Sequence, residues 1–176
     1  ISFSNDEDAR KNFNPYTSGF EAVEYNDVEA LKQLFVEKAD KICGFLVEPI
    51  QGEAGVNVPS EGYLKACEEL CKQHNVLFIA DEIQTGIART GKMLAIDHEN
   101  INADVLILGK AVSGGVYPVS AVLANDEVMN VIKPGQHGST FGGNPLAAAV
   151  AMEALQVVLD EKLADNSERL GQIFRA

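Results

Sequence analysis

Positively charged residues are scarce in this sequence, and their scarcity limits the partners it can have. The 176 residues include 14 Lys and Arg against 26 Asp and Glu, which gives a formal net charge of −12 at pH 7. Nucleic-acid backbones and anionic membrane surfaces require clustered Lys and Arg that neutralise phosphate groups. We therefore expect neither a nucleic acid nor a membrane surface as a partner, and we interpret the acidity as favouring solubility.

Long apolar runs and paired cysteines are also missing. No apolar run approaches the roughly 18 residues that a bilayer-spanning helix needs. Cys43, Cys67 and Cys71 are odd in number, and the last two lie four residues apart rather than in a C-x-x-C pair. Disulfide frameworks and zinc sites use other spacings. We predict reduced core thiols, no metal site, and an intracellular protein of the cytoplasm or the mitochondrial matrix.

Both ends of the sequence lack the features of natural termini. The first residue is Ile1 rather than Met, and no charged leader followed by an apolar stretch precedes the globular pattern. The last residue, Ala176, falls inside a predicted helix. A content of 46% hydrophobic and 23% charged residues is typical of a globular domain with a sizeable core. We expect one domain-sized piece that has been cut at both ends.

Short apolar runs that alternate with amphipathic segments predict an α/β fold. Four runs are typical of buried strands: residues 42–47, 76–80, 105–108 and 119–124. An intervening helix makes the first connection a right-handed parallel crossover. Only ten residues separate Leu108 from Val119, fewer than the dozen or so that a parallel crossover requires, so the fourth strand should run antiparallel. We predict a mixed, mostly parallel sheet with flanking helices.

Capping residues and apolar residues at helical spacing predict the helices. Asn26 should cap a helix over 27–39, and Ser60 should cap a second helix that ends near Asn75. Asn125 should cap a short helix, and Pro145 is well placed in the first turn of a long one. Residues 1–25 show no clear period, so we predict a loop or an extended surface segment there.

The stretch LFIADEIQTGIARTGKM, residues 77–93, looks at first like a nucleotide hydrolase. Its apolar run ends in Asp81-Glu82 like a magnesium-binding strand, and GIARTGKM is one residue short of a phosphate-binding loop. However, Met93 stands where a Ser or Thr must bind magnesium, and no convincing helix follows to cradle phosphates. We interpret the match as chance. Magnesium-dependent nucleotide binding would revive this alternative.

Three ionisable residues follow three predicted strands, where ligands of open α/β sheets bind. Glu48, Asp81 and Lys110 come at or just past the strand ends. A lysine with a lowered pKa can form a Schiff base with a carbonyl compound, and a carboxylate can keep a pyridine nitrogen protonated. This pair is typical of pyridoxal phosphate. Gln84 could donate its amide to the phenolic oxygen of the ring, although a turn residue on the surface is the plainer interpretation.

Four motifs then carry a resemblance to a known family. They are VEPIQGEAGV (47–56), LFIADEIQTGIARTGK (77–92), LGKAVSGGVYPVSAVL (108–123) and GQHGSTFGGNPLAAAVA (135–151). In this order they closely resemble the class III aminotransferases of the fold-type I pyridoxal phosphate group, and the ornithine aminotransferases most of all. The similarity covers nearly the whole chain, and only about the first 25 residues match loosely.

The resemblance implies a role for each matching residue. Lys110 would hold the cofactor through a Schiff base and move the proton on the substrate, Asp81 would pair with the pyridine nitrogen, and Gln84 with the phenolic oxygen. Ser139 and Thr140 match the residues that reach across a dimer interface to the phosphate of the partner's cofactor. Read alone, HGSTFGGN is only a polar glycine loop.

Two acidic residues match family residues that lie near the substrate. Glu53 matches the acid that pairs with an arginine in this family and swings aside when glutamate or 2-oxoglutarate enters. Glu48 matches a supporting acid at the same strand end.

The resemblance also implies a reaction and an assembly. The δ-amino group of L-ornithine would pass through pyridoxal phosphate to 2-oxoglutarate, giving glutamate 5-semialdehyde and glutamate, in a homodimer or higher homo-oligomer. Residues 1–176 would be the central part of the large cofactor domain, without its N- and C-terminal parts. The alternatives are a class III enzyme for acetylornithine or 4-aminobutyrate, and an inactive fragment that acts only through the dimer interface.

Overall fold

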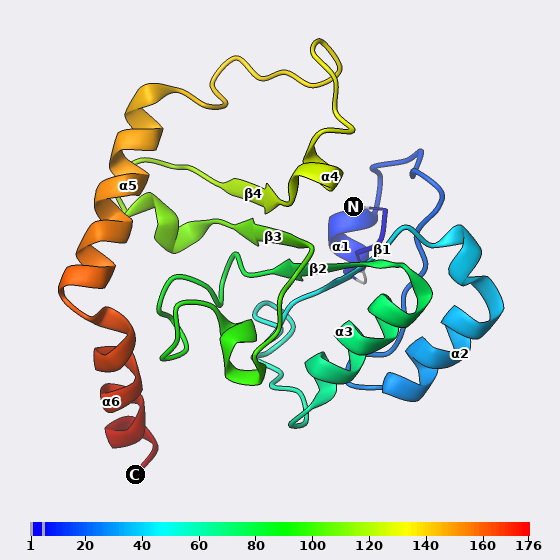
Figure 1. Cartoon of the computed structure of the whole chain (residues 1–176), viewed down its shortest axis with the longest axis horizontal. Helices are drawn as coiled ribbons and strands as arrows, with labels where there is room; N and C mark the ends of the chain where they lie inside the picture. Colours follow the sequence, from blue (N-terminus) through cyan, green and yellow to red (C-terminus); the bar gives the residue numbers. More distant parts are fainter. Residues whose placement is uncertain (1, 5) are drawn as a thin grey trace.

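The computed structural model describes residues 2–4 and 6–176, with a four-stranded sheet at its centre (Figure 1). The strands lie side by side in chain order: β1 (Gly44–Val47), β2 (Leu77–Asp81), β3 (Val105–Leu108) and β4 (Ala121–Ala124). The first three are parallel, and β4 runs antiparallel to β3. The predicted mixed sheet and the direction of its fourth strand are confirmed.

Helices connect and flank the strands. The α-helices are α1 (Glu7–Arg10), α2 (Val28–Lys38), α3 (Tyr63–His74), α4 (Asp126–Met129), α5 (Pro145–Asp160) and α6 (Leu163–Arg175). Three short 3-10 helices are η1 (Ala39–Lys41), η2 (Ala95–Glu99) and η3 (Lys110–Ser113). The segment expected to be irregular thus contains one helical turn, α1, because the carboxylate of Asp6 accepts hydrogen bonds from the first turn. Asn125 and Pro145 begin their helices as predicted.

The main core lies between the sheet and the helices α2 and α3, which flank one end of the sheet, while α5 and α6 stand at the other (Figure 1). Leu31 and Phe35 of α2, Cys67 of α3 and Phe78 of β2 are almost completely buried. Each large apolar side chain buried there contributes about 1.5–3 kcal/mol. Cys67 and Cys71 are core thiols as predicted, but Cys43 is exposed because it precedes the edge strand β1.

The predicted caps of α2 and α3 are wrong, and the reason is a contact between them. Asn26 and Ser60 hydrogen-bond to each other, with Asn26 Nδ2 3.0 Å from Ser60 Oγ and Ser60 N 2.9 Å from Asn26 Oδ1. Asp27 caps α2 instead. The first turn of α3 donates to the carboxylate of Glu99, from Lys65 N at 2.8 Å, across 34 residues of sequence. Local sequence could not show these long-range partners.

The side of the fold that carries β4, α5 and α6 exposes many apolar side chains. Val122 of β4, Met152 of α5 and Ile173 of α6 are between 57% and 72% exposed. Exposed apolar side chains that gather on one face are typical of surfaces that contact other protein segments. Within the described ranges, no helix has the length and apolar character that crossing a bilayer would take.

Candidate functional site

The sheet brings the predicted strand-end residues to one edge. Val47 pairs with Ala80 and Asp81 pairs with Ile107, so Glu48 follows β1 at the level of Asp81. Lys110 comes two residues after the end of β3 and begins η3. Parallel strands place their carboxyl ends together, and this edge is where ligands of open α/β sheets bind.

Asp81 is the last residue of β2 and is partly buried. Its Oδ1 atom accepts a hydrogen bond from the backbone N–H of Ile83 at 3.0 Å. Among the hydrogen bonds of the described residues, none uses Oδ2. The carboxylate is therefore oriented by one oxygen and has the other available for a donor, as a protonated ring nitrogen would require.

Lys110 is held in an unusual backbone conformation. Its φ angle of 42° lies in the left-handed region, which costs a residue with a side chain roughly 1–2 kcal/mol. Gly109 precedes it and packs so tightly that an added Cβ would lie 3.1 Å from Ile83 Cγ2. The side chain is exposed, and none of the ion pairs among the described residues includes it. Its amine is therefore accessible, without an ion-pair partner among the described residues.

The loop after β1 meets the loop after β2. The Nε2 atom of Gln84 donates to Glu53 Oε1 at 2.9 Å, and Gly52 N–H donates to Glu48 Oε2 at 3.0 Å. Gly52 approaches Gln84 so closely that a Cβ there would lie 2.5 Å from Gln84 Oε1. Four of the residues singled out by sequence, Glu48, Glu53, Asp81 and Gln84, thus belong to two adjoining loops and strand ends.

Ser139 and Thr140 stand apart from this group. They lie on the loop between α4 and α5, yellow in Figure 1, which runs outside β4, and both are exposed. Ser139 Oγ accepts from Gly142 N–H at 2.9 Å, which shapes the loop itself. No hydrogen bond among the described residues joins this loop to Asp81, Gln84 or Lys110. The chain does not bring the two predicted residues into its own site.

Sequence reasoning missed the role of Glu82. This side chain is 1% exposed, and its Oε1 atom accepts from Ile96 N–H at 2.9 Å while its Oε2 atom accepts from the hydroxyl of Thr85. In the sequence it suggested half of a magnesium-binding pair. The available signal was a Thr three residues after an acid that follows a buried strand. The segment it anchors leads into η2 rather than an α-helix, so a phosphate-binding loop is not formed.

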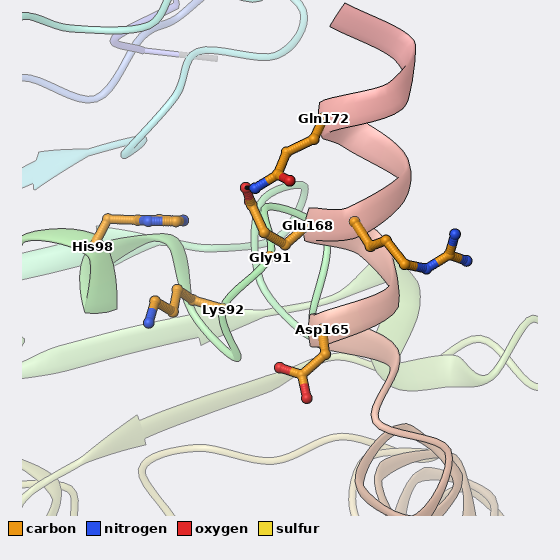
Figure 2. A pocket seen from close by; sticks show the side chains of 7 residues that line it. Gly91, Lys92, His98, Asp165, Glu168 and Gln172 are labelled. Atoms are coloured by element: carbon orange, nitrogen blue, oxygen red, sulfur yellow. Dashed lines mark hydrogen bonds between the residues drawn. The ribbon is translucent and has the colours of Figure 1, made fainter. Parts of the chain in front are cut away.

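A hollow of about 490 Å³ lies between the loop after β2 and α6. Figure 2 shows Lys92 and His98 on one side, facing Asp165, Glu168 and Gln172 of α6. Its charges are mixed, and Gln172 already donates to Glu168 at 2.8 Å. It is away from the strand ends and does not form a competing site. Within residues 2–4 and 6–176, no three His, Cys, Asp or Glu side chains gather as a metal ion would need.

Comparison with known families gives one match to the whole chain. The family model described as "Aminotransferase class-III" matches residues 1–176. A mitochondrial ornithine aminotransferase of Drosophila melanogaster is 59% identical over 175 residues, which are 99% of this chain and 40% of the fly protein. The mitochondrial ornithine aminotransferase of Oryza sativa subsp. japonica is 60% identical, over 99% of this chain and 37% of its own length.

Solved structures give the same picture. The ornithine aminotransferase of Toxoplasma gondii, described with partial occupancy of PLP at its active site, has a TM-score of 0.96 and 57% identity over 99% of this chain and 40% of its own. An acetylornithine aminotransferase of Elizabethkingia anophelis has a TM-score of 0.88 and 67% identity, over 90% of this chain and 42% of its own. The chain spans about two fifths of the length of these proteins.

Proposed function

The chain belongs to the class III aminotransferase family, and from that premise we propose that it is the central part of the large, cofactor-binding domain of an ornithine aminotransferase. The observation that carries the proposal is the sheet edge on which Asp81, Gln84 and Lys110 combine an oriented carboxylate, an amide donor and a free amine. The share of about 40% that the chain covers in its relatives supports the view that further segments complete the domain.

The chemistry of these residues fits pyridoxal phosphate, because a carboxylate oxygen, an amide donor and an amine are all available at one edge of the sheet. When bound, that cofactor supplies an electron sink for the negative charge that develops beside the transferred amino group. Asp81 Oδ2 would accept the hydrogen bond of the protonated ring nitrogen, and Gln84 Nε2 would donate to the phenolic oxygen with the hydrogen that Glu53 does not use. Lys110 Nζ would hold the cofactor through its carbonyl carbon and would serve as the acid and base for the proton at the carbon that bears the amino group.

The remaining predicted residues act at the edges of the site. Glu53 is exposed on the loop after β1 and offers an anion to a cationic substrate group or to an arginine outside this chain. Glu48 fixes that loop through Gly52 N–H. Ser139 and Thr140 are exposed and, among the described residues, make no hydrogen bond to Asp81, Gln84 or Lys110, and this supports their use at the cofactor phosphate of a second copy. The exposed apolar side chains of β4, α5 and α6 support a homodimer or higher homo-oligomer.

The reaction that follows is transfer of the δ-amino group of L-ornithine to 2-oxoglutarate, giving glutamate 5-semialdehyde and glutamate. The fly, rice and Toxoplasma relatives carry the ornithine name. Acetylornithine is the second candidate donor, because the Elizabethkingia protein with that name is 67% identical to this chain. The mitochondrial names of the fly and rice proteins favour the mitochondrial matrix over the cytoplasm.

A spectral titration tests the cofactor and a substrate comparison tests the donor. In the full-length enzyme, pyridoxal phosphate should give a visible band that borohydride removes and that Lys110→Ala abolishes. With 2-oxoglutarate as acceptor, kcat/KM should be higher for ornithine than for acetylornithine. A visible band with the reverse preference would keep the aminotransferase and overturn the ornithine assignment. A wild-type enzyme without a band would overturn both.

A further inference from the structure

Glu82 is a buried carboxylate without a positively charged neighbour. Its side chain is 1% exposed, and none of the Lys, Arg or His side chains that the structure describes forms an ion pair with it. A buried charge without hydrogen bonds or a counter-ion is strongly unfavourable. Glu82 must therefore be stabilised by its two donors alone, and the fold retains it although an apolar residue would be easier to bury.

The two donors belong to the two ends of the segment that follows β2. The Thr85 hydroxyl lies three residues after Glu82, whereas the Ile96 N–H lies fourteen residues after it, in the first turn of η2. One carboxylate thereby closes both the tight turn directly after β2 and the whole loop up to residue 96. The backbone supports the turn as well, because Gly86 N–H donates to the carbonyl oxygen of Glu82 at 2.9 Å.

The turn that Glu82 closes presents the candidate cofactor contacts. Asp81 is its preceding neighbour, and Gln84 lies between Glu82 and Thr85, where its amide faces Glu53. The backbone N–H of Glu82 donates to Ile107 O at 2.9 Å, which ties the start of the turn to the neighbouring strand β3. A shift of Glu82 would therefore move the Gln84 amide and rotate the Asp81 carboxylate.

We propose that Glu82 is a positioning residue for Asp81 and Gln84, and that its buried carboxylate sets the cofactor-binding geometry of the strand edge without touching the cofactor. This inference rests on the proposed function, because the geometry that it sets is that of the pyridoxal phosphate site. The role that we propose requires a side chain with two acceptor oxygens at position 82. A carboxylate accepts from both donors at once, whereas alanine leaves the Ile96 N–H and the Thr85 hydroxyl buried without acceptors.

The test compares Glu82 variants with a buried acid elsewhere in the same enzyme. Glu82→Ala removes both acceptors, Glu82→Gln keeps one, and Thr85→Val removes one donor while the carboxyl group of Glu82 remains. Glu68→Gln is the matched control, because Glu68 is also 1% exposed but is held by Lys65 and Lys72 on α3 and contacts none of the site residues. Each full-length variant is titrated with pyridoxal phosphate, and the melting temperature and the pH midpoint of the visible band are recorded.

Glu82→Ala should weaken pyridoxal phosphate binding about tenfold and move the pH midpoint of the band, and the two milder variants should weaken binding about threefold. Glu68→Gln should lower the melting temperature while the affinity stays within about twofold of wild type. Equal losses of affinity in Glu82→Ala and Glu68→Gln would reduce the role of Glu82 to general stability and overturn the proposal.

Should Glu82→Ala fail to fold, the pyridoxal phosphate affinities of Glu82→Gln and Thr85→Val test the positioning role instead. Wild-type affinity and an unchanged band in both would overturn the positioning role. A wild-type enzyme that binds no pyridoxal phosphate would instead overturn the proposed function, and the positioning role with it.

Discussion

Replacing Gly52 with alanine would place a methyl group inside the side-chain amide of Gln84. The added Cβ would lie 2.5 Å from Oε1, 2.6 Å from Cδ and 2.8 Å from Nε2, whereas ordinary contacts begin at 3.4 Å. The amide must therefore retreat by roughly an ångström, and it is the group that moves because it ends a flexible, partly exposed side chain. The φ angle of Gly52 is not among the positive ones, so the clash, rather than backbone strain, is the perturbation.

The retreat breaks the hydrogen bond from Gln84 Nε2 to Glu53, now 2.9 Å long, and removes the donor from the position proposed for the cofactor's phenolic oxygen. A single hydrogen bond contributes about 1 kcal/mol, which corresponds to about a fivefold change in a dissociation constant. We expect Gly52→Ala in the full-length enzyme to weaken pyridoxal phosphate binding by about that factor. Absorbance titration measures it.

A double-mutant cycle decides whether the clash is the cause. Gln84→Ala alone should weaken binding by a similar factor, and adding Gly52→Ala to it should have no further effect, because the clashing group is gone. Gly171→Ala in α6 is the control, since its Cβ would meet only Arg175 Nη1 at an ordinary 3.4 Å. Independent, additive losses in the cycle would refute the reasoning.

Three further predictions concern charge and reactivity. Asp81→Asn should lower kcat/KM by about 10²–10³, because an amide cannot hold the ring nitrogen's proton as the carboxylate does, and an unchanged value would remove Asp81 from the mechanism. Burial alone would raise the pKa of Glu68, but its two lysine partners more than offset it and lower the pKa from 4.5. The free energy of unfolding in urea should therefore contain a contribution from Glu68 that is present above pH 4.5 and is lost as the pH falls below it. The Glu68→Gln variant should lack this pH-dependent contribution. Burial raises the pKa of Cys67 to about 11 and of Cys71 to about 12, so at pH 8 a thiol reagent should label the exposed Cys43 first, and peptide mapping that finds all three labelled at one rate would contradict this.

The strands were predictable because their signal is local. Continuous apolar runs coincide with β1 to β3 within one or two residues, and the short connection from Leu108 to Val119 was enough to give the direction of β4. The caps of α2 and α3 were not predictable, because Asn26 and Ser60 hydrogen-bond to each other across 34 residues of sequence. A cap is predictable only where its partner is a near neighbour in the chain.

The candidate site was predictable to a similar extent. The positions of Asp81 and Lys110 follow from strand ends, which the apolar pattern shows. The contact between Gln84 and Glu53 spans 31 residues, and neither the local pattern nor the family resemblance predicted it. Glu82 was interpreted through its neighbour Asp81, and Thr85, three residues later, was a local sign of a buried acceptor that this interpretation left unused.

The left-handed backbone conformation of Lys110 is unfavourable for any residue with a side chain. At a φ of 42°, glycine would be more stable than lysine by about 1 kcal/mol. Selection for stability alone would favour glycine at this position, and the proposed Schiff-base role would explain why a lysine stands there. A screen of this protein for heat resistance should therefore recover Lys110→Gly, a variant that the proposed function predicts to be inactive.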